Sequence, residues 1–328
     1  MQGLYIDRYG GPQVVQLRTD LPRPGAAPGH VLVKVACAGI NFMDVHTRQG
    51  KYALSRTYPV RLPCTLGMEG AGEVVEVGEG AGHFRPGDRV AWCIAWGSFA
   101  EYVSVPAARL AKIPDGIGYD VAAAAIFQGS TAHYLVQDIA RLAPGSSCLI
   151  HAAAGSIGQL LVQLAHRCGA RVLATGSSPS KCAVARRLGA EQAMGYEHFA
   201  DQVLAATGGC GVDVVFDSLG KATLRESFRA CRARGLVINY GNVSGSVRDL
   251  DPIELGEAGS LFLTRPRLAD HMADGVTVQR RADAVFAAIL DGSLQVQIEG
   301  RYRLDEVAQV HARIEAREMI GKAVVVMG

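Results

Sequence analysis

The chain has 328 residues, of which 49% are hydrophobic and 20% charged, and its formal net charge is +2. This length and composition suit about two domains with separate cores, and they exclude long disordered stretches. The small net charge argues against nucleic acid or a membrane surface as a partner, so we expect a small-molecule ligand.

The eight cysteines lie far apart in the sequence, and the closest two, Cys168 and Cys182, are 14 positions apart. The sequence therefore has no Cys-x-x-Cys pair for a metal or a redox centre, and we expect reduced, mostly buried thiols. The N-terminus has no basic leader followed by an apolar run, and no apolar stretch approaches the roughly 20 residues of a membrane helix. We therefore expect a cytoplasmic protein.

Residues 1 to about 120 are predicted to form an all-β domain. Residues 31–35 show the period-2 alternation of a half-buried strand. Turn residues such as Pro86-Gly87-Asp88-Arg89 predict tight bends between short strands. An irregular β-barrel follows from this pattern.

From about residue 125, strands alternate with helical patterns, as in βαβ units around a parallel sheet. The first unit has an apolar strand at residues 147–151 and then a helix with one apolar face from Ile157 to Cys168. Later strands are expected at residues 171–175, 212–216, 236–239 and 261–264. The final part predicts helices at residues 282–290 and 305–316 and a strand at 323–326 that returns to the first domain.

The expected fold class is therefore α/β, with a doubly wound parallel sheet beside a barrel domain. We place the dinucleotide-binding domain at residues 125–266. The barrel domain takes residues 1–124 and is completed by residues 267–328.

A glycine-rich turn joins the first strand of the second domain to its helix. It reads Ala153-Ala154-Gly155-Ser156-Ile157-Gly158, a GxGxxG pattern with alanine in first place. In this position Gly155 lets the backbone approach a pyrophosphate, and Gly158 lets helix and strand pack closely. The helix N-terminus offers N–H groups and a positive dipole to phosphates. The alternative is a turn of small residues that binds nothing.

The charge pattern predicts NADPH rather than NADH. An NAD site places an Asp or Glu at the end of the second strand, but no acid occurs between Ile139 and Ala190. The turn after that strand instead offers Ser177 and Lys181 to a 2′-phosphate. Lys181 has the alternative interpretation of an ordinary solvated lysine.

Two further segments end strands at the sheet edge where ligands of open α/β sheets bind. They are Asp217-Ser218-Leu219-Gly220 and Asn239-Tyr240-Gly241-Asn242. We interpret Ser218, Leu219, Gly241 and Asn242 as contacts to the ribose and nicotinamide. The alternative is a pair of tight loops.

Over essentially its whole length the chain resembles the zinc-independent, zeta-crystallin-like quinone oxidoreductases of the medium-chain dehydrogenase/reductase superfamily. Several blocks in the right order carry this resemblance. They lie at residues 38–44, 48–52, 86–90, 151–158, 215–220, 240–242 and 264–266.

The resemblance implies a GroES-like N-terminal domain, a Rossmann domain and an active site in the cleft between them. It implies a homodimer joined through the strand at about residues 261–265. It also assigns roles to single residues. Asn41, Tyr52 and Thr131 would line the nicotinamide end, Ser177, Lys181 and Tyr196 the adenosine phosphate end, and Asn242 the ribose. Apart from the resemblance, the position of Arg265 before Pro266 suggests that it holds a loop against the cofactor or else caps a strand at the surface.

Zinc-dependent relatives need a Cys and a His at two positions that here hold Asn41 and Met68. An amide and a thioether cannot replace thiolate and imidazole as Zn²⁺ ligands, so no metal is expected.

Without a Lewis acid, the substrate should already be electrophilic, as quinones and enones are. NADPH-dependent quinone reduction is the leading hypothesis, and reduction of a double bond in an enone or enoyl thioester is the alternative. A non-enzymatic, crystallin-like NADPH-binding protein is the alternative from another class. Tyr52 is a candidate proton donor or a packed wall, whereas Asp44 and the lone His46 are interpreted as structural.

Overall fold

The computed structural model describes residues 1–328, which form two units divided within helix α2 (Tyr119–Tyr134). One unit comprises residues 1–130 and 271–328, and the other comprises residues 131–270. The expected boundaries, after residues 124 and 266, lie a few residues away. The reason is that α2 is continuous across the first division, so no loop marks it.

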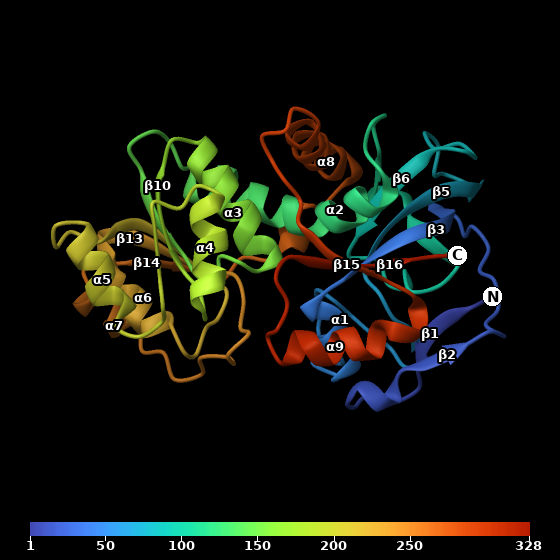
Figure 1. The fold of residues 1–328 in the computed structure, drawn as a ribbon. Helices are drawn as coiled ribbons and strands as arrows, with labels where there is room; N and C mark the ends of the chain where they lie inside the picture. Colours follow the sequence, from blue (N-terminus) through green and yellow to red (C-terminus); the bar gives the residue numbers. More distant parts are fainter. The chain divides into compact units, whose positions relative to one another are not determined.

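The first unit contains a seven-stranded sheet with the order β15-β16-β3-β5-β6-β8, in which β7 also pairs with β3. Figure 1 labels β3, β5, β6, β15 and β16 of this sheet. Its strands are β3 (His30–Ile40), β5 (Glu69–Val77), β6 (Arg89–Cys93), β7 (Tyr102–Pro106), β8 (Leu110–Lys112), β15 (Ile298–Tyr302) and β16 (Lys322–Val326). A smaller antiparallel sheet contains β1 (Gly3–Ile6), β2 (Gln16–Arg18) and β4 (Cys64–Thr65). Strand β16 pairs antiparallel with β3, from Ala323 opposite Ile40 to Val326 opposite Cys37. The predicted return of the last strand to the first domain is confirmed.

The N-terminal part is not all-β, because helix α1 (Phe42–Arg48) follows β3 directly. The Asp44 carboxyl group accepts the Asn41 backbone N–H at 2.7 Å and so stabilises the first turn of this helix. The unit also contains helix α8 (Gly275–Leu290), which begins seven residues before the predicted 282–290, and helix α9 (Val307–Glu315), which lies within the predicted 305–316.

The second unit has a parallel six-stranded sheet with the order β11-β10-β9-β12-β13-β14. Its strands are β9 (Ser147–Ile150), β10 (Arg171–Thr175), β11 (Gln192–Met194), β12 (Val212–Asp217), β13 (Cys231–Asn239) and β14 (Phe262–Thr264). The helices are α3 (Ser156–Arg167), α4 (Pro179–Arg187), α5 (Phe199–Ala206), α6 (Leu224–Ala230) and α7 (Ile253–Glu257). This is the doubly wound order 3-2-1-4-5-6, in which ligands bind at the carboxyl ends of the strands where the order reverses.

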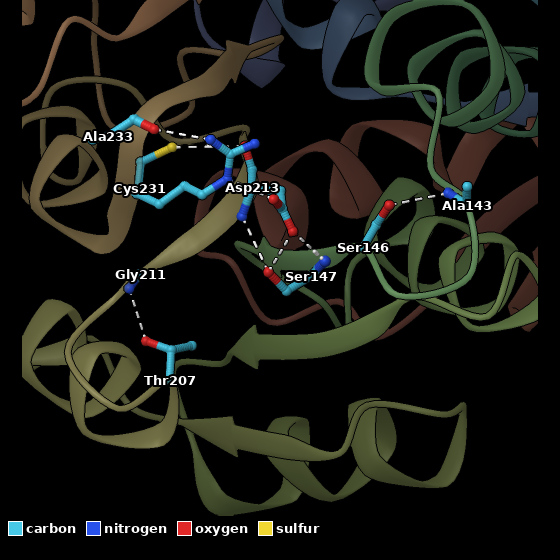
Figure 2. A network of polar contacts seen from close by, with 9 residues as sticks. Ala143, Ser146, Ser147, Thr207, Gly211, Asp213, Cys231 and Ala233 are labelled. Atoms are coloured by element: carbon cyan, nitrogen blue, oxygen red, sulfur yellow. Dashed lines mark hydrogen bonds and ion pairs between the residues drawn. The ribbon is translucent and has the colours of Figure 1, made fainter.

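The amino ends of three strands are joined by one carboxylate (Figure 2). Asp213 of β12 accepts hydrogen bonds from the Ser147 backbone N–H of β9 at 2.7 Å and from Arg232 of β13 at 2.6 Å. This network lies at the edge of the sheet opposite the carboxyl ends.

All eight cysteines are free thiols, and five of them are buried. None of the helices is both long and apolar enough to cross a membrane.

Candidate active site

The turn between β9 and α3 brings backbone close to backbone. A Cβ atom added at Gly158 would lie 2.3 Å from the Ala152 carbonyl oxygen, closer than real Cβ atoms come to other atoms. At Gly155, which precedes α3, an added Cβ would have only one neighbour, the same oxygen at 3.2 Å. Gly158 therefore permits the close packing of the helix on the strand, and Gly155 leaves the N-terminus of the helix accessible to a ligand.

The first turn of α3 suits a phosphate. Its first N–H groups have no partner within the helix, and it contains no acidic side chain that would cancel the positive end of the helix dipole. Ala154 is buried, whereas Gly155, Ser156 and Ile157 are partly exposed. These residues form a cradle that fits a pyrophosphate.

The turn after β10 brings the predicted phosphate-binding residues together. Lys181 Nζ lies 3.3 Å from Ser177 Oγ, and Ser178 caps α4 by accepting the Lys181 backbone N–H. The strand ends on the hydroxyl of Thr175 rather than on a carboxylate. An ammonium and hydroxyl groups therefore stand where a 2′-phosphate would be bound.

Tyr196 is hydrogen-bonded to the turn that follows β9, because its hydroxyl oxygen accepts the Ala152 backbone N–H at 3.1 Å. Burial raises the pKa of this phenol. Beneath it, His151 contacts Thr175 Oγ at 2.8 Å and Ser227 Oγ at 3.0 Å. Burial lowers the pKa of His151, so this histidine is a neutral structural support.

The loops after β12 and β13 lie against each other. Asp217 is buried and accepts the backbone N–H groups of Leu219 at 2.8 Å and Gly220 at 2.9 Å, which fixes the loop that contains Ser218. An added Cβ at Gly241 would lie 2.3 Å from the Ser218 carbonyl oxygen.

The side chains of two other residues predicted to bind the cofactor, Asn242 and Arg265, are hydrogen-bonded to close neighbours in the sequence. Asn242 donates to Ser246 Oγ at 3.1 Å, and the Arg265 guanidinium is exposed and donates to the Pro266 carbonyl at 3.2 Å.

In the first unit, Asn41 lies in a buried polar network. Its side-chain oxygen accepts from Lys322 Nζ at 2.7 Å and from Gln128 Nε2 at 2.6 Å, and its nitrogen donates to Glu69 at 3.0 Å and to the Gly39 carbonyl at 3.2 Å. Lys322 Nζ also lies 2.7 Å from the same Glu69 oxygen. The Asn41 amide is thus hydrogen-bonded within the protein on both its oxygen and its nitrogen.

Met68, at the second position where zinc-dependent relatives have a ligand, lies beside this network. Met68 is fully buried, and its sulfur lies 3.5 Å from the Asn41 amide nitrogen. Across residues 1–328, no group of three or more His, Cys, Asp or Glu side chains is placed to hold a metal ion.

Tyr52 is half-buried and lies beside His46, whose Nδ1 is 3.4 Å from the Tyr52 hydroxyl oxygen. His46 was interpreted as a packing histidine without an acid partner; it is buried and packs against the Phe42 ring, and it also contacts the Tyr52 hydroxyl. Thr131 is buried in α2 and is the first residue of the second unit.

Sequence reasoning missed Lys322, Gln128 and the role of Glu69. Lys322 Nζ reaches Glu69 across 253 positions and Asn41 across 281, and no local pattern reports such distances. The available signal was a lysine at the start of an apolar strand, Lys322 before 323–326, where a fully buried cation needs a buried partner.

Two family models match this chain: "Alcohol dehydrogenase GroES-like domain" over residues 27–115, and "Zinc-binding dehydrogenase" over residues 156–268. The chain is 37% identical to the quinone oxidoreductase of Pseudomonas aeruginosa, and the match covers 96% of each. It is 36% identical to the 2-haloacrylate reductase of a Burkholderia species, over 97% of each. The solved structure of Escherichia coli quinone oxidoreductase complexed with NADPH is similar over the full length of both chains, with a TM-score of 0.95 and 31% identity.

Proposed function

The chain belongs to the quinone oxidoreductases of the medium-chain dehydrogenase/reductase superfamily, and from this premise we propose that it reduces quinones with NADPH and without a catalytic metal. The observation that carries this proposal is the phosphate cradle at Gly155 and Ser156, beside a second strand that ends without an acid. The full-length match to an NADPH-complexed quinone oxidoreductase supports it.

NADPH would be held by the second unit. The cradle residues Ala154 to Gly158 would bind the pyrophosphate, and Ser177, Lys181 and Tyr196 the 2′-phosphate end. The loops at Ser218, Leu219, Gly241 and Asn242 would contact the ribose and nicotinamide, and Arg265 would hold a loop against the cofactor. When bound, the cofactor supplies a hydride, which is one proton with two electrons. One further proton completes the reduction of a quinone to a hydroquinone.

The chemistry of the donor groups supports the proposed metal independence. The two ligand positions present the Asn41 amide and the Met68 thioether, which are poor ligands for Zn²⁺. The Lys322 ammonium, 2.7 Å from Asn41 and from Glu69, supplies a fixed positive charge there, which would repel a divalent cation. Asn41 would line the nicotinamide end, where hydrogen bonds to its side-chain oxygen and nitrogen hold the amide in place.

The absence of a suitable metal site narrows the substrate class. A Lewis acid assists the reduction of a simple ketone by stabilising the alkoxide that forms, whereas the charge on a reduced quinone is delocalised over its ring and needs less stabilisation. We therefore propose quinones as the substrate, and Tyr52 as a residue that lines its position. Thr131 stays a predicted contact of the nicotinamide end.

A second candidate is the reduction of an activated carbon–carbon double bond. Its support is the 36% identity to a 2-haloacrylate reductase, together with a tyrosine hydroxyl that could deliver a proton to carbon.

The deciding experiment measures NADPH consumption by the purified protein with a panel of quinones, alkenals and enoyl thioesters, with and without a chelator. We expect quinones to be the best acceptors, NADPH to be preferred to NADH, and the chelator to have no effect. Faster turnover of the double-bond substrates would select the second candidate. If NADPH binds and no acceptor oxidises it, the chain is an NADPH-binding protein instead.

The proposed assembly is a homodimer, and the proposed location is the cytoplasm. Support for the dimer comes from β14, which is the edge strand of its sheet and carries Phe262 with 64% of its surface exposed. An exposed edge strand is a template for pairing with a second copy. Light scattering on the purified protein tests this assembly.

A further inference from the structure

Helix α1 ends in a way that turns the chain back onto its own last turn. Gly50 has a positive φ of 79°, its N–H donates to the Thr47 carbonyl, and the Lys51 N–H donates to the His46 carbonyl, both at 3.0 Å. These two bonds form the motif in which a left-handed glycine satisfies the last carbonyls of a helix. The next residue is Tyr52, which is thereby brought beside His46.

The two side chains form part of an aromatic cluster. The rings of His46 and Tyr52 have centroids 6.0 Å apart and an interplanar angle of 70°. Phe42 packs edge-on against His46 at 4.7 Å, and Tyr58 packs against Tyr52 at 5.7 Å. The cluster restricts both rings, so the 3.4 Å contact between His46 Nδ1 and the Tyr52 hydroxyl is held by packing as well as by hydrogen bonding.

The proton on the imidazole can be assigned from its surroundings. His46 Nε2 is buried and has no hydrogen-bond partner. An unpaired buried N–H is less tolerated than an unpaired lone pair, so the neutral ring carries its proton on Nδ1. Burial, with a smaller contribution from the charge of Lys51, lowers the pKa of His46 to about 4, so the ring is neutral at physiological pH.

We infer that His46 is a positioning residue for the proposed reduction: its Nδ1–H donates to the Tyr52 hydroxyl oxygen and turns the hydroxyl proton away from His46, ready for transfer to the reduced substrate. This inference rests on the proposed function. After hydride arrival the Tyr52 O–H bond breaks, and its proton forms an O–H bond on a hydroquinone or a C–H bond on a reduced enone. His46 stabilises the resulting phenolate, which regains a proton from solvent.

The test uses His46→Phe, which keeps an aromatic ring beside Phe42 but has no N–H, and His46→Asn, whose amide nitrogen can take the place of Nδ1. With the acceptor that the wild type reduces fastest, we expect His46→Phe to lower kcat about tenfold with KM changed less than about twofold, and His46→Asn to recover most of that loss. In a Tyr52→Phe background, His46→Phe should have no further effect. The exposed His83→Phe is the matched control and should equal the wild type.

Three outcomes would overturn the inference. They are an unchanged kcat in His46→Phe, an equal loss in His46→Asn and His46→Phe, and a loss in His46→Phe that persists in the Tyr52→Phe background.

A measurement that does not depend on enzymatic activity distinguishes failure of the His46 inference from failure of the proposed function. If none of the acceptors in the panel is reduced by the wild type, the proposed function fails, and the catalytic role of His46 fails with it. The hydrogen bond is then tested alone by the urea midpoints of the two single variants and the double variant. Additive shifts would show that the two side chains are not coupled, and a double variant that shifts less than the sum would show that they are.

Discussion

Lys322 Nζ lies 2.7 Å from Glu69 Oε2, and both side chains are almost completely buried. Lys322 begins β16, Glu69 begins β5, and Asn41 follows β3, which lies between these two strands in the sheet. The ion pair therefore joins the ends of three neighbouring strands and connects the C-terminal segment to the N-terminal part of the same unit.

Lys322→Met should strongly destabilise the protein. The substitution leaves the Glu69 carboxylate buried without its cation, and breaking a buried pair on one side costs about 3–5 kcal/mol. Urea unfolding at pH 7 measures this loss. The double variant Lys322→Met with Glu69→Gln removes both charges and should recover much of the stability, because the uncompensated charge, rather than the lost contact, is the main cost. A double variant no more stable than Lys322→Met would contradict this explanation.

Gly158→Val should abolish NADPH binding and destabilise the second unit. The added Cβ would meet the Ala152 carbonyl oxygen at 2.3 Å, so either the turn or the helix must move. Binding is measured by calorimetry, and stability by the thermal midpoint. Gly256→Ala in α7 is the matched control, since nothing lies within 4 Å of a Cβ added there. NADPH binding with unchanged affinity by Gly158→Val would show that this turn does not form the cofactor site.

Lys181→Glu should weaken NADPH binding about tenfold or more and leave NADH binding nearly unchanged. The exchange replaces a cation with an anion beside the proposed 2′-phosphate position, and one charge-assisted hydrogen bond accounts for roughly 1.5–3 kcal/mol. The control is Arg187→Glu, which makes the same change of charge at the other, exposed end of α4. Equal loss for both cofactors, or an equal effect of Arg187→Glu, would contradict the assignment of Lys181.

Sequence reasoning predicted those features that are set by local pattern. The strand, turn and helix around Gly155 and Gly158 follow from a run of apolar residues, two glycines and one apolar helix face, all within about 20 positions. Helix α1 was not predicted, because it has only seven residues and because Asn and Asp, here Asn41 and Asp44, favour turns as much as helix starts. The Lys322–Glu69 ion pair was not predicted for a different reason. The two residues are 253 positions apart in the sequence, and only the fold brings them together.

The contact of His46 with Tyr52 is an intermediate case. The two residues are only six positions apart, but the end of α1 at Gly50 decides whether the rings meet. A glycine after a short helix is a recognisable signal. It could not be used here because the helix itself was not predicted.

Buried histidines should make the protein sensitive to acid. His311 is fully buried, neither of its ring nitrogens has a partner, and burial, followed by the charge of Arg48, lowers its pKa to about 3. In the unfolded chain its pKa is about 6.5. Unfolding therefore takes up a proton between these values, and stability falls as the pH falls from about 6.5 toward 3, by up to about 4 kcal/mol.

His311→Leu tests this prediction, because leucine keeps the site filled and cannot take up a proton. Urea midpoints at pH 7, 5 and 4 should fall less in this variant than in the wild type. At pH 7 the variant should be about as stable as the wild type, since it removes two unsatisfied nitrogens. An equal slope of stability with pH in both proteins would show that His311 does not cause the acid sensitivity.

Asp44 should have the opposite pH dependence. Burial raises its pKa to about 7, compared with about 3.9 in an unfolded chain, so the folded protein binds the extra proton. Its contribution to stability is therefore complete below about pH 4 and is lost as the pH rises to 7, by a few kcal/mol.

Asp44→Asn keeps an oxygen that can accept the Asn41 N–H, and it carries no charge to desolvate. We expect Asp44→Asn to be more stable than the wild type at pH 8 and similar to it at pH 5, as measured by urea unfolding. Asp44→Ala removes the acceptor and should lose about 1–2 kcal/mol at both pH values, because the first turn of α1 loses its bond to Asn41. If Asp44→Asn is destabilised at pH 8 as much as Asp44→Ala, the carboxylate is ionised and stabilising in the folded protein, and the raised pKa is wrong.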